Sequence, residues 1–220
     1  MMSYSVRPIN TTQTEVHDKL EEYVKRYQQA PRRRPVSEHT QLAFDAAIEW
    51  LGDWQGPIIF DSCCGVGEST AVIAAQYPDA KVIGIDKSAA RLAKHTSYTN
   101  ASSNYQVIRA DVNDFWYLAQ QHGIKLSHHF LLYPNPYPKP GQIQKRWHAG
   151  PAMPDFIALG GTIEVRSNWR LLLEEFRLAL IIYGIESELT AVSGEPMTPF
   201  ERKYLLSGQD CWRLVTQHRM

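Results

Sequence analysis

Cysteine is scarce in this sequence, with three among 220 residues. Two are adjacent, Cys63 and Cys64, and the third is Cys211. A disulfide framework needs several cysteines at regular spacing, and a structural zinc site needs four ligands at matched spacing. The cysteines therefore exclude a disulfide scaffold, predict no metal site and are typical of a reducing compartment. We expect the protein to be cytoplasmic.

The chain also lacks a long apolar run and an excess of charge of either sign. No stretch approaches the roughly 18 apolar residues of a membrane helix, and residues 1–23 contain no apolar core of a signal peptide. Lysine plus arginine number 23, and aspartate plus glutamate also number 23. The overall charge therefore points to no nucleic-acid partner, and a local basic patch would have to bind one.

Two helices are predicted before the first buried strand. Residues 14–29 and 37–51 both carry apolar residues at helical spacing, and the basic run Arg32–Arg34 separates them. The sequence predicts a helical, basic extension over residues 1–36, followed by one domain over residues 37–220.

From residue 57 onward, short apolar runs that end in a polar residue alternate with helix-like segments. This alternation predicts an α/β fold with a doubly wound, mostly parallel, Rossmann-like sheet. Ligands of such sheets bind at the carboxyl ends of the strands. The residues expected at those ends are Asp61, Asp86, Asp111 and Asn135.

The turn after the first strand resembles a glycine-rich ligand loop. It keeps Gly65 and Gly67 and has Cys63 where a first glycine would stand. Such a turn alone is weak evidence for a ligand site, since many tight turns contain two glycines. A dinucleotide loop has a third glycine that admits the pyrophosphate, and Thr70 stands there instead. The loop therefore favours S-adenosylmethionine, with Asp86 as acceptor for the ribose hydroxyls.

Four segments resemble a known family. Residues 58–86 look like the cofactor motifs of class I methyltransferases. Pro134–Lys139 (PNPYPK) resembles the P-D-P-W-P-K motif of the bacterial tRNA (guanine-N7)-methyltransferases. Ser167–Asn168 resembles the family's T-D pair, and Thr198–Glu201 resembles its T-x-F/Y-E element. The resemblance implies methyl transfer from S-adenosylmethionine to guanine N7 of tRNA.

Carried over by position, the resemblance implies three sets of residues. Asn135 would be the catalytic residue. The cofactor-binding residues would be Asp61, Cys63, Gly65, Gly67, Asp86, Asp111, Val112 and Asn135. The substrate-binding residues would be Lys139, Asn168, Thr198, Phe200 and Glu201. Apart from the resemblance, basic residues that can bind phosphate are candidate tRNA contacts: Arg32, Arg33, Arg34, Lys139, Lys145 and Arg146.

Departures from the family pattern leave alternatives open. Asn135 and Asn168 replace two aspartates, and a charged acceptor contributes about 1.5–3 kcal/mol against roughly 1 for a neutral one. A non-catalytic RNA-binding or partner subunit is therefore the second interpretation. Asn135–Tyr137 also resembles, one proline short, the N-P-P-Y motif of methyltransferases that act on exocyclic amines. A small-molecule acceptor is a further alternative.

Overall fold

The computed structural model describes residues 6–30 and 32–217. Residues 1–5 and 31 of the predicted extension lie outside the described residues. The helices are α1 (Leu20–Gln29), α2 (Glu38–Leu51), α3 (Glu68–Gln76), α4 (Ala89–Leu92), α5 (Val112–Gln121), α6 (Met153–Ala158), α7 (Arg170–Ile182) and α8 (Pro199–Leu206), with short 3-10 turns η1 (His95–Ser97), η2 (Pro140–Lys145) and η3 (Trp147–Ala149). The strands are β1 (Ile58–Ser62), β2 (Lys81–Asp86), β3 (Tyr105–Arg109), β4 (His128–Leu132), β5 (Thr162–Ser167), β6 (Ser187–Ala191) and β7 (Trp212–Thr216).

The chain divides into two compact units. Unit 1 comprises the residues up to Arg32, residues 133–154 and the residues from Glu164 onward. Unit 2 comprises residues 33–132 and 155–163. The residues up to Arg32 therefore belong to the same unit as the later part of the chain.

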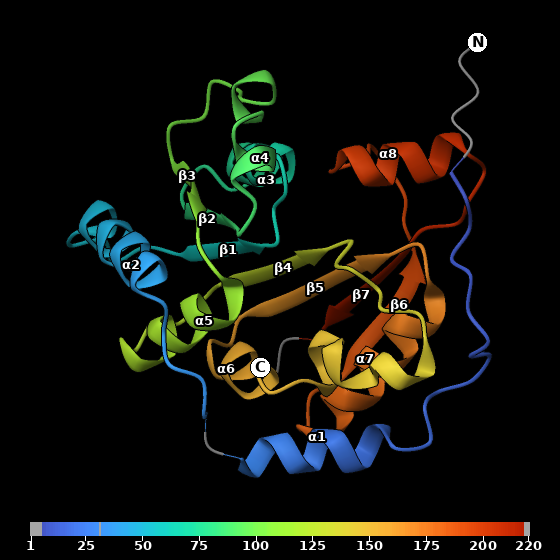
Figure 1. The fold of residues 1–220 in the computed structure, drawn as a ribbon. Coiled ribbons are helices and arrows are strands. Elements are labelled where there is room, and N and C mark those ends of the chain that lie inside the picture. The colour runs from blue at the N-terminus through green and yellow to red at the C-terminus, as the bar shows by residue number, and fades with distance from the viewer. Residues whose placement is uncertain (1–5, 31, 218–220) are drawn as a thin grey trace. The chain divides into compact units, whose positions relative to one another are not determined.

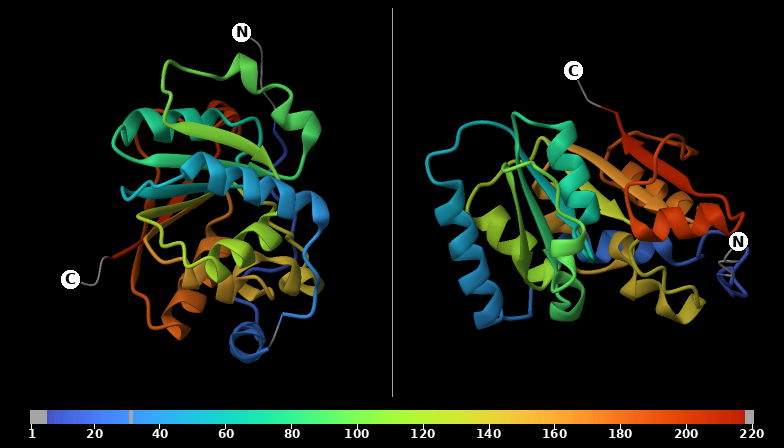
Figure 2. Two further views of the ribbon diagram at one scale, coloured as in Figure 1. Left: turned by 90° about the vertical axis from the view of Figure 1, so that its left-hand side faces the viewer. Right: turned by 90° about the horizontal axis from the view of Figure 1, so that it is seen from above.

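Unit 2 contains the parallel strands β1 to β4. β1 pairs with β2 and with β4, and β2 pairs with β3, all in parallel. Strands β1, β2 and β4 are buried along almost their whole length, as expected for parallel strands covered on both faces. α3 covers one face, and α5 with α2 covers the other (Figure 1, Figure 2). Because these strands run parallel, the loops after β1, β2 and β3 lie at one edge of the sheet.

Close packing of α3 on β2 depends on Gly84. A Cβ at this position would lie 2.3 Å from Thr70 Oγ1, so only glycine fits at this point of β2. Thr70 stands where a dinucleotide loop has its third glycine. The helix therefore approaches the sheet through a glycine on the strand instead of one on the helix.

Unit 1 is built around antiparallel strands. β7 pairs with β5 and with β6, both antiparallel, and α7 packs on β6 and β7. α1 lies against α7 (Figure 1), and its buried residues Leu20 and Val24 form the predicted apolar stripe. The predicted start of this helix at residue 14 is wrong, because the helix begins at Leu20 and the preceding segment bonds to other parts of the unit.

The strand order is β3-β2-β1-β4-β5-β7-β6, and the predicted α/β fold with a mostly parallel, Rossmann-like sheet is confirmed. The pattern of residues 87–96 also predicts one helix, but this segment contains only α4 and η1. β6 and β7 were not predicted. Across the described residues, no helix is both long and apolar enough to cross a bilayer.

Candidate cofactor and substrate sites

The glycine-rich loop of unit 2 has a backbone that favours glycine at three positions. The φ angles are 64° at Cys63, 62° at Gly65 and 78° at Gly67. Cys63 therefore adopts the left-handed conformation of the glycine that it replaces, at a strain of about 1–2 kcal/mol for a residue with a Cβ. Loop shape is thus retained although one glycine is replaced.

The two glycines of this loop serve different purposes. A Cβ on Gly67 would lie 2.6 Å from His95 Nδ1 and 2.8 Å from Val107 Cγ1, so Gly67 is required for packing. A Cβ on Gly65 would meet only Arg91 Cδ, at 4.0 Å. Gly65 therefore leaves open space beside its backbone, where a ligand can approach closely.

Asp86 holds the glycine-rich loop against the end of β2. Its Oδ2 accepts the Gly65 N–H at 3.0 Å, its Oδ1 accepts the Ser88 N–H at 2.8 Å, and Arg91 Nη1 lies 3.5 Å from Oδ2. A carboxylate offers about four acceptor sites, so at least one remains for a ribose hydroxyl. Sequence reasoning missed Arg91, whose position in the helix after β2 was the available signal.

Asp61 supports the loop from beneath. The residue is fully buried, and its Oδ2 accepts hydrogen bonds from Ser69 Oγ at 2.6 Å and Thr70 Oγ1 at 2.7 Å. Its Oδ1 has no hydrogen-bond partner among the described residues. Burial raises the pKa of Asp61 to about 6, although the two hydroxyls lower it. In this structure Asp61 fixes the first turn of α3 to β1.

Asp111 and Val112 begin α5. Asp111 is the N-cap and accepts the Asn113 N–H at 3.0 Å, and its Oδ2 accepts from Arg34 Nη2 at 3.0 Å. Burial raises the pKa of Asp111, but the bonds from Asn113 and Arg34 outweigh it and the pKa is lowered. Val112 belongs to the first helical turn, whose N–H groups have no partner within the helix. This backbone can donate to the edge of an adenine.

In unit 1, the PNPYPK motif lies in a strained loop, which we call the proline-motif loop (residues 133–139). Tyr133 and Tyr137 have φ angles of 52° and 45°, and each precedes a proline. Left-handed backbone is rare for bulky residues and is disfavoured before proline. Asn135 is exposed and its Oδ1 accepts the Tyr137 N–H at 3.3 Å, and Lys139 is also exposed. The loop thus presents Asn135 and Lys139 on a strained backbone.

The other predicted substrate residues of unit 1 differ in exposure. Thr198 caps α8, with its Oγ1 accepting the Glu201 N–H at 3.0 Å, and Phe200 is 46% exposed. Asn168 Nδ2 donates to Gln209 Oε1 at 3.0 Å. Glu201 is fully buried and pairs with Arg166. Its carboxylate therefore faces an arginine and not the solvent.

The predicted tRNA contacts include one that the structure contradicts. Arg146 is 1% exposed and its guanidinium binds groups of its own unit, so it is not a surface contact for tRNA. Arg34 is exposed but pairs with Asp111. Arg33, Lys139 and Lys145 are exposed.

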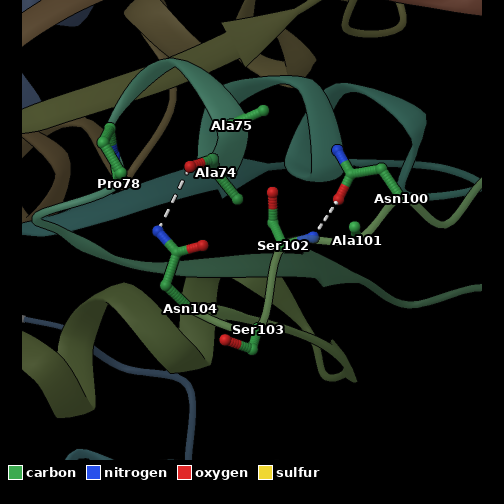
Figure 3. Close-up of a pocket in the computed structure, with 8 residues that line it drawn as sticks. All are labelled: Ala74, Ala75, Pro78, Asn100, Ala101, Ser102, Ser103 and Asn104. Atoms are coloured by element: carbon green, nitrogen blue, oxygen red, sulfur yellow. Dashed lines mark hydrogen bonds between the residues drawn. The ribbon is translucent and has the colours of Figure 1, made fainter.

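A pocket of unit 2 lies at the edge of the parallel strands opposite to the glycine-rich loop. It has a volume of about 540 Å³ and is formed by the end of α3 and the segment before β3 (Figure 3). Asn104 Nδ2 donates to the carbonyls of Ala74, Tyr77 and Ala80, so it closes the end of the helix. Its lining contains none of the predicted site residues: Ala74, Ala75, Pro78, Asn100, Ala101, Ser102, Ser103 and Asn104.

Comparisons with known proteins agree with this arrangement. Residues 55–214 match the family model described as "Putative methyltransferase". No curated protein matches the chain by sequence. A solved structure of an antibiotic-related methyltransferase is 14% identical over 86% of this chain and 97% of its own, with a TM-score of 0.57. The 16S rRNA methyltransferase KamB is 16% identical over 86% and 97%, with a TM-score of 0.56.

The antibiotic-resistance methyltransferase Kmr is 15% identical over 88% of this chain and 97% of its own, with a TM-score of 0.53. At these identities the structural likeness shows the fold alone. The family match is independent of that likeness and covers more than half of the chain. The chain therefore belongs to this methyltransferase family, the family of the tRNA guanine-N7 methyltransferases.

Proposed function

We propose that this chain transfers a methyl group from S-adenosylmethionine to N7 of guanine in tRNA. The observation that carries the proposal is the proline-motif loop, which presents Asn135 and Lys139 on a backbone strained at two tyrosines. Strained backbone persists where surrounding structure enforces it, and such sites cluster where ligands bind. The family's motif and an exposed, strained loop coincide at this position.

S-adenosylmethionine, when bound, supplies a methyl group on a positively charged sulfur. Gly65 leaves room for it, Asp86 has an acceptor site for a ribose hydroxyl, and the first turn of α5 offers N–H donors near Asp111. Guanine N7 carries a lone pair that accepts without losing a proton. The chain's own residues therefore need to orient the base and exclude water, and no general base is required.

In this proposal, the exposed groups of unit 1 contact the tRNA. Lys139 and Lys145 bind phosphates, and Arg33 of unit 2 is a further candidate. Phe200 offers an exposed ring on which a splayed base can stack. Asn135 contacts the reacting base through its amide. A neutral amide contributes less to this contact than the family's aspartate, so slow turnover is expected.

The buried Arg166–Glu201 pair favours a second candidate function, a non-catalytic RNA-binding subunit. The family resemblance assigns Glu201 to the base, and guanine N1–H and its exocyclic amine are suitable donors for a carboxylate. Here Glu201 is fully buried, and Arg166 Nη1 contacts both of its carboxylate oxygens. A chain that no longer uses Glu201 for the base can bind tRNA without methylating it.

One experiment separates the two. The protein is incubated with labelled S-adenosylmethionine and unmodified tRNA, and the tRNA is digested to nucleosides. Label in 7-methylguanosine supports the proposed reaction. tRNA binding without label favours the binding subunit, and label in an exocyclic amine or in a small acceptor directs the assignment to those alternatives.

A further inference from the structure

Side chains from two distant segments hold three consecutive carbonyls of the proline-motif loop. Arg146 Nε donates to the Tyr137 carbonyl at 3.1 Å, and Thr11 Oγ1 donates to the Pro138 carbonyl at 2.5 Å. Arg146 Nη2 makes a longer contact of 3.5 Å with the Lys139 carbonyl. Tyr137 is one of the two strained residues. Arg146 and Thr11 therefore bind the loop at and directly after a residue with a strained backbone.

Arg146 is itself fixed from every side. Its Nη1 pairs with Glu175 Oε2 at 2.5 Å, its Nη2 donates to Gln13 Oε1 at 2.9 Å, and its guanidinium lies 4.9 Å from the ring centre of Trp169. A buried arginine is costly unless it is paired and hydrogen-bonded. These contacts explain why Arg146, which follows Lys145 in a basic run expected at the surface, lies in the interior.

The N-terminal segment (residues 11–17) completes this arrangement. Glu175 Oε1 accepts the side-chain N–H of Gln13 at 2.6 Å and the backbone N–H of His17 at 3.0 Å. Glu175 Oε2 accepts a hydrogen bond from Arg146 Nη1 and lies 3.1 Å from His148 Nε2. One buried carboxylate of α7 thus joins the N-terminal segment to Arg146, and both of these hold the loop.

We propose that the N-terminal segment positions the proline-motif loop for methyl transfer, with Thr11 and Arg146 as positioning residues. This inference rests on the proposed function. Asn135 lies two residues before the first held carbonyl and Lys139 carries the last one, so their placement relative to a bound base depends on the loop backbone. A displacement of about 1 Å at a reacting group can reduce a rate roughly 100-fold. Thr11 and Arg146 need not touch the substrate to have this effect.

The test uses Thr11→Val, Thr11→Ser and a matched control, Thr12→Val, at the exposed neighbour. Valine keeps the shape of threonine without the donor, and serine keeps the donor. We expect Thr11→Val to lower kcat about tenfold or more, Thr11→Ser to restore most of it, and Thr12→Val to match the wild type. The Kd for S-adenosylmethionine is expected to change far less than kcat in all three, because the cofactor residues Gly65 and Asp86 belong to unit 2.

A second variant, Arg146→Lys, keeps the charge but cannot bridge Tyr137, Glu175 and Gln13 at once. Hydrogen exchange of the amides of residues 135–146 provides a readout that needs no activity, and faster exchange is expected in Thr11→Val and Arg146→Lys. An active wild type with equal kcat in Thr11→Val overturns the inference. If the wild type transfers no methyl group, the proposed function fails, and the exchange rates alone decide: unchanged exchange in both variants overturns the positioning role.

Discussion

Arg166 Nη1 lies 2.9 Å and 3.2 Å from the two carboxylate oxygens of Glu201, in the interior of unit 1. Arg166 Nε also donates to Glu164 Oε1 at 2.7 Å, and Arg213 Nη2 donates to the other oxygen of Glu164. Four charges therefore alternate in sign across β5, β7 and α8. This pairing removes Glu201 from the exposed residues that can recognise a base, and it makes Arg166 a structural counter-ion.

Replacement of Arg166 by methionine should be strongly destabilising. It leaves the buried carboxylate of Glu201 unpaired, which costs about 3–5 kcal/mol of unfolding free energy. The exposed Arg170–Glu174 pair is the matched control, and Arg170→Met is expected to change stability by less than about 1 kcal/mol. Urea unfolding measures both. The double variant Arg166→Met/Glu201→Gln should recover part of the loss, and a single variant as stable as the wild type would contradict the pairing.

Replacement of Cys63 by glycine should stabilise the protein. The φ of 64° costs a residue with a Cβ about 1–2 kcal/mol, and this strain is removed in the glycine variant. The larger conformational entropy of glycine in the unfolded state opposes the gain by roughly 0.5–1 kcal/mol. A net gain of about 0.5–1 kcal/mol is expected. Cys64→Gly is the control, since Cys64 is buried without a positive φ and its replacement removes packing. Thermal unfolding that ranks Cys64→Gly above Cys63→Gly would show that the strain is absent.

Several features of this fold could be predicted from the sequence because they depend on local pattern. Apolar runs ending in acids predicted β1 to β3, and the missing glycine was located at Cys63, where the structure retains the glycine conformation. β6 and β7 were missed because they are largely half-buried or exposed, so they lack the continuous apolar signal of β1 and β2.

The interior charges of unit 1 could not be predicted in the same way. Arginine is rarely buried unless it is paired, so Arg146 was assigned to the surface. Its partner Glu175 lies 29 residues away on α7, and nothing local indicates that pairing. Glu201 was assigned to the substrate by resemblance, and only the fold shows Arg166 against it. Unlike a strand or a helix, a long-range ion pair leaves no periodic pattern in the sequence from which it could be predicted.

The open space at Gly65 predicts a selective loss of cofactor affinity in Gly65→Ala. The added Cβ would enter the space that a ligand needs, so the Kd for S-adenosylmethionine should rise at least about tenfold. Gly123→Ala is the matched control, because Gly123 also has a positive φ of 78° and an added Cβ there meets nothing within 4 Å. Both variants should lose about 1 kcal/mol of stability from backbone strain. Equal cofactor affinity in the two, measured by calorimetry, would place the ligand elsewhere.

The lowered pKa of Glu175 predicts that the protein loses stability in acid. Burial raises the pKa of Glu175, but His148 and Arg146 outweigh it and hold the pKa at about 2, against an ordinary value of 4.5. A lowered folded-state pKa means that the stabilisation is complete above the ordinary glutamate pKa and is lost as the pH falls from there toward the folded-state pKa. The stabilisation is about 3 kcal/mol.

The test compares Glu175→Gln with Glu174→Gln, whose carboxylate pairs with Arg170 on the surface. Urea unfolding is measured between about pH 3 and about pH 7, a range that includes the ordinary glutamate pKa. Glu175→Gln should be less stable at neutral pH and should lose part of the acid dependence, and Glu174→Gln should follow the wild type. Parallel curves for all three proteins would rule out the lowered pKa.

Charge neutralisation at Lys145 should weaken tRNA binding in a salt-dependent way. Lys145 is exposed beside the proline-motif loop in sequence, and removing one phosphate-binding charge there lowers the slope of log K against log salt by about 1. Lys145→Gln is compared with Lys125→Gln, whose ammonium donates to the Ala158 carbonyl at 2.7 Å and which has no predicted role in tRNA binding. Filter binding at several salt concentrations gives both slopes. An unchanged slope in Lys145→Gln would remove this residue from the interface, and an equal fall in both variants would indicate unspecific attraction to the whole surface. A fall confined to Lys145→Gln would establish a local basic patch on a chain whose net charge is zero.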